Sequence, residues 1–157
     1  MRFDESIKRT TVLGLIALAL AGMGIPPARA AASRVLNVRD EGKLHFITSD
    51  GSEIIDEGPA LGTVPGKVRV YFVYNGEPTV SARFTIYGRS GSISGRAKAR
   101  LSNPTSPDPS FRGAFTITAG SGRYAHIHGT GELFGVFYRR GSDKYGLVVQ
   151  TIGKLPY

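Results

Sequence analysis

The chain has 157 residues, with 20 Lys and Arg against 12 Asp and Glu, a formal net charge of +8, and no cysteine. The lack of cysteine excludes disulfides, thiol catalysis, zinc–thiolate sites and iron–sulfur clusters. Residues 31–157, which follow an N-terminal segment with the pattern of an export signal, have the length of one ordinary domain.

Residues 1–30 have the pattern of an export signal. A weakly basic start precedes an apolar run at residues 12–25, and Ala28-Arg29-Ala30 supplies the small residues that signal peptidase accepts. We expect cleavage after Ala30, with Ala32 as the alternative. The run is shorter than the roughly 20 residues of a membrane-spanning helix, so cleavage is favoured over anchoring. The mature protein is therefore expected in the periplasm or outside the cell.

Residues 31–157 form the predicted domain, which keeps sixteen basic and ten acidic residues, a net charge of +6. Apolar and polar residues alternate between clusters of Gly, Pro, Asn, Asp and Ser, which is typical of short antiparallel strands. We predict nine strands, of which the first can be a frayed lead-in. They span residues 33–38, 42–48, 54–57, 67–74, 79–87, 92–101, 111–118, 124–137 and 145–155.

The segments between these strands predict their own connections. Residues 74–77 form a tight hairpin turn, because Asn75-Gly76 tolerates positive φ. Residues 88–91 and 141–144 look like further hairpin loops. Residues 102–110 contain three prolines, so they are expected to form a long exposed loop.

The central strands predict which face is buried. Side chains alternate along a strand, so the apolar set in each strand should line the interior. This set comprises Val80, Ala82, Phe84, Ile86, Ala97, Ala99, Leu101, Phe111, Gly113, Phe115 and Ile117. A sheet with one apolar face and no helices buries that face by closing or by stacking on another sheet.

Glycines recur inside the strands and favour closure, because they allow sharp curvature or close backbone approach. They are Gly95, Gly113, Gly129, Gly131 and Gly135. The predicted fold is therefore all-β, a single small closed antiparallel barrel of about eight strands, with a β-sandwich as the alternative.

Residues 115–124, FTITAGSGRY, and the following Gly129-Thr130-Gly131 suggest a family. This segment resembles the hairpin motif of allene oxide cyclase-like and dirigent-like barrels, in which a strand, a glycine-rich turn, an aromatic residue and a glycine-containing strand follow one another. Ala119 stands where the first glycine of that turn is usual. The resemblance implies an exported bacterial member with an eight-stranded barrel and a cavity, often assembled as a trimer. It assigns no catalytic residue, because none of the family's catalytic positions can be matched here.

Large apolar residues are predicted to line the lumen, which suits a small hydrophobic or phenolic ligand. The candidates are Val70, Phe72, Phe84, Phe111 and Phe115. The alternative is that these side chains fill the barrel completely.

A basic stripe is predicted on the outer wall. It comprises Arg83, Arg96, Lys98, Arg100 and Arg112. Such a wall can attract anionic lipids or polysaccharides, although a solvated, solubilising face is the favoured interpretation. Nucleic acid is disfavoured as a partner, because the chain is expected to be exported and no aromatic stacking motif accompanies the stripe.

His126 and His128 are weak candidates for metal binding. If residues 124–137 form one strand, both imidazoles share a face with Tyr124 and Glu132. A third suitable ligand is not evident, so we expect these side chains to belong to the outward polar face and predict no metal or cofactor.

Three functions remain open at this point. The leading one is a binding module for a small apolar or phenolic ligand. The enzyme alternative is a cofactor-free cyclase or isomerase that shields a reactive intermediate from water. The third is a structural or surface-interaction protein that acts through the basic wall.

Overall fold

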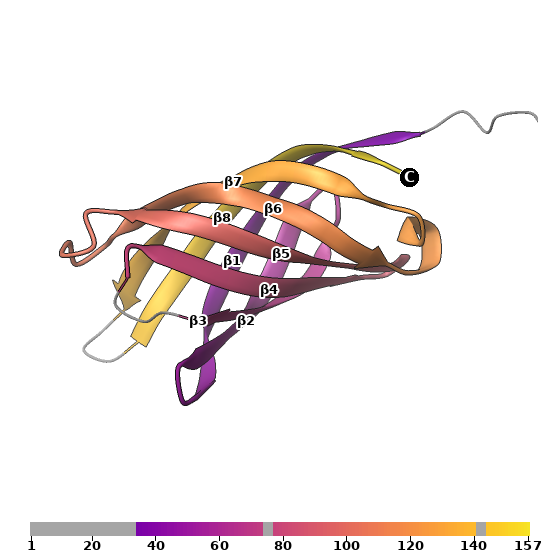
Figure 1. Ribbon diagram of the computed structural model, residues 1–157. Helices are drawn as coiled ribbons and strands as arrows, with labels where there is room; N and C mark the ends of the chain where they lie inside the picture. Colours follow the sequence, from indigo (N-terminus) through magenta and orange to yellow (C-terminus); the bar gives the residue numbers. More distant parts are fainter. Residues whose placement is uncertain (1–33, 74–76, 141–143) are drawn as a thin grey trace, which may run out of the picture. The chain divides into compact units, whose positions relative to one another are not determined.

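The computed structural model describes residues 34–73, 77–140 and 144–157, which form a closed antiparallel barrel of eight strands (Figure 1). Each strand pairs with the next along the chain, and β1 pairs with β8 to close the barrel. The strands are β1 (Val35–Asp50), β2 (Glu53–Gly62), β3 (Gly66–Val73), β4 (Thr79–Gly88), β5 (Gly91–Ser102), β6 (Ser110–Gly120), β7 (Gly129–Arg140) and β8 (Lys144–Pro156). The prediction of a closed barrel is confirmed, whereas the predicted signal peptide lies outside the described residues.

The first two predicted strands are one strand, β1. Asp40 and Glu41, which we left in a gap between them, pair with Thr151 and Gln150 on β8 and continue the ladder. Three charged residues in a row, Arg39 to Glu41, hid the continuity of the alternation, because Asp40 occupies an inward position that a strand usually gives to an apolar side chain.

The strand predicted for residues 124–137 begins at Gly129 instead. A 3-10 turn, η1 (Gly122–Tyr124), interrupts it, with φ of 57° at Gly122 and 115° at Gly129. The backbone N–H groups of Ala125 and Ile127 donate to the carbonyls of Gly122 and Tyr124, so this segment coils rather than extends. Tyr124, which we expected to face outward, is therefore buried.

The other connections agree with the sequence where the structure describes them. The turn between β4 and β5 lies at residues 88–91, with φ of 139° at Gly91. The proline-rich loop connects β5 to β6 and projects beyond the barrel at the end opposite η1 (Figure 1). Residues 74–76 and 141–143, in the other two predicted turns, lie outside the described residues.

The interior packs phenyl rings against glycines. A Cβ on Gly95 would lie 2.5 Å from Cζ of Phe84, and a Cβ on Gly131 would overlap the ring of Phe115. The rings of Phe84 and Phe115 meet edge to face, with centroids 6.1 Å apart. The strand glycines thus provide the space that the large interior side chains occupy.

The two barrel ends are closed differently. At the capped end, defined by the β2–β3 and β4–β5 turns and residues 121–128, Val64, Ile93 and Leu155 are at most 2 % exposed. At the aromatic end, the Phe137 ring lies 6.0 Å from that of Phe72 and 5.1 Å from that of Phe111. Within the described part of the chain, no helix has the length and apolar character needed to cross a membrane.

Candidate functional site

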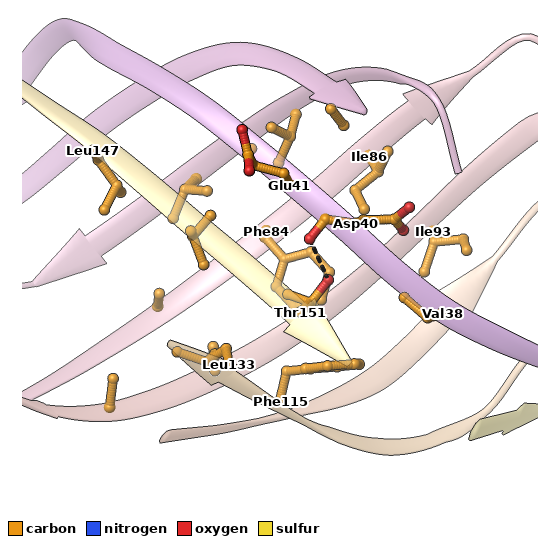
Figure 2. A pocket seen from close by; sticks show the side chains of 18 of the residues that line it. Val38, Asp40, Glu41, Phe84, Ile86, Ile93, Phe115, Leu133, Leu147 and Thr151 are labelled. Atoms are coloured by element: carbon orange, nitrogen blue, oxygen red, sulfur yellow. Dashed lines mark hydrogen bonds between the residues drawn. The ribbon is translucent and has the colours of Figure 1, made fainter. Parts of the chain in front are cut away.

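A cavity of about 120 Å³ remains inside the barrel, with walls from all eight strands (Figure 2). One water needs roughly 10–15 Å³, so this space has room for several waters or for a small ligand. The side chains of the barrel therefore do not fill it completely. All five predicted lumen residues line the cavity; they are Val70, Phe72, Phe84, Phe111 and Phe115. Their role in ligand binding stays a prediction.

The inward positions follow the predicted alternation on the central strands. Val80, Ala82, Phe84 and Ile86 of β4 all line the cavity. Ala97 and Ala99 of β5 do so too, while Leu101 is buried in the core. This apolar lining makes any polar atom that faces the cavity chemically important, because such an atom has few groups to pair with.

Asp40 is an acid among these apolar side chains, and sequence reasoning missed it. It follows Val38 and precedes Gly42 on the inward face of β1, and it is 6 % exposed. Its Oδ1 accepts the backbone N–H of Val64 at 3.0 Å. Gly62 leaves room for this carboxyl group, because a Cβ there would lie 2.5 Å from the same oxygen.

The second carboxyl oxygen of Asp40 has no partner. Among the described residues, Oδ2 is the one buried side-chain nitrogen or oxygen without a hydrogen bond. Burial raises the pKa of Asp40, and the hydrogen bonds from the backbone of Val64 and of Thr63 oppose that rise to a smaller extent. Burial thus makes ionisation of this carboxyl group harder than in water, while the two backbone hydrogen bonds favour the ionised form.

The other polar side chains of the cavity wall are already engaged. Thr151 Oγ1 donates to the backbone carbonyl of Asp40 at 3.5 Å, the contact drawn in Figure 2. Glu41 Oε2 accepts from Gln150 Nε2 at 3.1 Å, and Glu41 Oε1 lies 3.4 Å from Lys43 Nζ. Among the described side chains that line the cavity, Asp40 Oδ2 is therefore the buried polar atom left without a hydrogen bond.

A second buried acid, Asp56, lies on β2 between Ile54 and Gly58, outside the cavity lining. It is 4 % exposed, and burial raises its pKa to about 6, although the positive charge of His45 acts in the opposite direction. Asp56 is opposite Val70 of β3 and Phe46 of β1 in the ladder. Strand alternation would have revealed Asp56 and Asp40 alike, since each interrupts a set of inward apolar or small residues.

The predicted basic wall lies on β4, β5 and β6, which are neighbours as expected. All five of its side chains are exposed: Arg83, Arg96, Lys98, Arg100 and Arg112. Whether this wall binds an anion stays a prediction.

The two candidate histidines are not on a strand. His126 and His128 lie between η1 and β7, and His128 Nδ1 is 3.0 Å from the carbonyl oxygen of His126. The shared strand face that we predicted for them is therefore wrong, because the chain coils before Gly129. Within the described ranges, no three His, Asp or Glu side chains gather in a way that could hold a metal ion.

Comparisons with protein-family models, with curated proteins and with solved structures found no match to this chain. The resemblance to allene oxide cyclase-like and dirigent-like barrels therefore stays a prediction from the motif.

Proposed function

We propose that this protein binds a small, largely apolar molecule inside the barrel and that Asp40 holds the polar group of that molecule. The observation that carries the proposal is the unpartnered Oδ2 of Asp40, a residue that lines an apolar cavity. Leaving a buried polar atom unpaired costs about 1–3 kcal/mol, so a ligand that donates a hydrogen bond there recovers free energy that the empty site lacks.

The cavity favours a particular ligand chemistry. A hydroxyl group donates to a carboxyl oxygen, and an aromatic or aliphatic body suits walls such as Phe84, Phe115 and Leu133. Each Å² of apolar surface removed from water contributes about 25 cal/mol. A small phenol or alcohol combines both requirements, which is consistent with the ligand class that we expected from the sequence.

The sharpest test compares a para-alkylphenol with its methyl ether. The two have similar apolar surfaces, but only the phenol donates a hydrogen bond, so we expect it to bind about tenfold more tightly, equivalent to one buried hydrogen bond. Ligand-induced changes in NMR spectra or in melting temperature measure both affinities. Equal affinities would show that Asp40 plays no part in binding.

The Asp40→Asn variant provides the matched control. Its amide oxygen can keep the Val64 N–H bond, and its NH₂ group then replaces Oδ2 with a donor. The preference for the phenol should therefore be lost, because the phenol oxygen and the ether oxygen can both accept from this NH₂ group. Native mass spectrometry of the purified protein adds an independent readout, because a co-purifying phenol or lipid would identify the natural ligand class.

The enzyme alternative rests on a second observation, the raised pKa of Asp40 inside an apolar cavity. Such a carboxyl group can exchange a proton with a bound substrate where bulk water is excluded. A cofactor-free isomerase or cyclase would use it in that role. Turnover of an allene oxide tests this function, and Asp40→Asn should abolish turnover while apolar ligands still bind. Turnover that persists in this variant would exclude Asp40 as the proton carrier.

A further inference from the structure

The positive charge of the domain is concentrated in one part of the chain. Residues 78–131 carry seven basic side chains and one acidic side chain, whereas the rest of residues 31–157 carries nine of each. The net charge of +6 thus belongs to the segment that contains β4, β5 and β6, three adjacent strands of the barrel. One side of the barrel is strongly basic, and the remaining sequence is balanced.

The cations on this side oppose one another in register. Arg83 lies directly opposite Arg96, and Arg100 lies directly opposite Arg112. Like charges at directly opposite positions of neighbouring strands are destabilising. The fold therefore gains nothing from this arrangement, which points to a role outside folding.

Acidic side chains neutralise only the edges of the wall. Arg83 Nη2 lies 2.6 Å from Glu53 Oε1, and Arg112 Nη2 lies 3.5 Å from Glu132 Oε2. The three cations of the central strand form no ion pair with any residue that the structure describes; they are Arg96, Lys98 and Arg100. A bound anionic molecule would neutralise these three cations.

A shallow hollow of about 570 Å³ lies on the same wall. Short side chains that include Ser81, Ala114 and Thr116 line it together with Arg96 and Lys98, and Glu53, the partner of Arg83, also lies in its lining. Residues two apart on a strand are about 6.8 Å apart, so the cations of β5 form an evenly spaced row. Such a row suits a linear chain that carries repeated negative groups, and the hydroxyls of Ser81 and Thr116 suit the hydroxyls of a sugar.

We propose that the outer wall of β4, β5 and β6 binds an acidic polysaccharide, a linear saccharide that carries carboxylate or sulfate groups. Arginine forks bind such groups with paired hydrogen bonds, and the wall supplies several of them. Two other polyanions fit less well. The Tyr71 ring that a nucleobase would stack on already lies under Arg83, 5.4 Å from the guanidinium carbon. A membrane surface would need apolar side chains to insert, and the exposed large hydrophobic residue on these three strands is Tyr87.

The test measures binding of the purified protein to heparin fragments and to polygalacturonate at about 0.01 M ionic strength, where charges act over about 30 Å. The wall variant Arg96→Glu/Lys98→Glu is compared with Arg39→Glu/Lys154→Glu, which reverses two exposed charges on β1 and β8. Both variants change the net charge equally. We expect the wall variant to lose at least about tenfold in affinity and the control less than about threefold, with affinity falling as salt rises.

Three outcomes would overturn the assignment. The first is no binding of either polysaccharide by the wild-type protein. The second is an equal loss in both variants, which would show that net charge alone causes attraction. The third is tighter binding to single-stranded oligothymidine or to phosphatidylglycerol vesicles than to both polysaccharides. The barrel cavity plays no part in these measurements, so their outcome is independent of ligand binding at Asp40.

Discussion

Asp56 should make the stability of this protein depend on pH. Its side chain is buried on β2, and burial raises its pKa from 3.8 to about 6. In the unfolded chain the same carboxyl group is hydrated and ionises at its ordinary pKa. Between these two pKa values the folded protein binds more protons than the unfolded chain.

The sign of the effect follows from this difference in bound protons. The contribution of Asp56 to stability is greatest below about pH 4, where this carboxyl group is protonated in both states, and it falls as pH rises toward 6, because folding then requires a buried charge. A shift of about two pKa units corresponds to roughly 3 kcal/mol of unfolding free energy, lost by about pH 7. His45 reduces the loss, because its positive charge favours the ionised carboxyl group.

Asp56→Asn removes the titration and nearly keeps the shape of the side chain. We expect the variant to gain about 3 kcal/mol relative to the wild-type protein between pH 4 and pH 7. Urea unfolding at unit pH steps, followed by circular dichroism, measures this gain. Asp50→Asn, at the exposed end of β1, is the control and should follow the wild-type curve. A constant difference between Asp56→Asn and the wild-type protein across this range would refute the reasoning.

Three further predictions concern packing, surface charge and the salt bridges of β3. Gly131→Ala should destabilise the fold by about 1–3 kcal/mol or more, because the added methyl group overlaps the Phe115 ring. The control Gly153→Ala, whose methyl group would lie 3.2 Å from the same ring, should destabilise it less. Equal losses of melting temperature in the two variants would contradict this reasoning. Arg96→Glu should raise the free energy of unfolding by about 0.2–1 kcal/mol, because it places an acid opposite Arg83. An unchanged or lower melting temperature would argue against repulsion between Arg83 and Arg96. The ion pairs of Glu57 with Lys67 and Arg69 lower the pKa of its carboxyl group. Its contribution to stability is therefore present above its unfolded pKa and is lost as pH falls through its folded pKa. Acid unfolding of Glu57→Gln should accordingly depend less on pH than that of the wild-type protein.

Many of the side chains that face the barrel interior could be predicted from the local alternation of apolar and polar residues. The inward set on β4, β5 and β6 required only the rule that neighbouring side chains face opposite ways, so Phe84, Ala97 and Phe115 were assigned correctly. The same rule, applied across the apparent gap in β1, would also have placed Asp40 inside the barrel. It failed at Tyr124, where a coil between strands reversed the alternation and buried a residue that we expected to be exposed.

The sequence alone determined that this is an all-β domain, because strand alternation and turn residues are local properties of the chain. It favoured a closed barrel over a β-sandwich, and the pairing of β1 with β8 in the tertiary structure decided between the two. Only the tertiary structure decided which residues of different strands contact one another. It brings the carboxyl group of Asp40 to the N–H of Val64, twenty-four residues away, and leaves the second oxygen unpaired. It also aligns Arg83 with Arg96 and the glycines with the phenyl rings. These contacts depend on the register between strands, which closure of all eight strands fixes together.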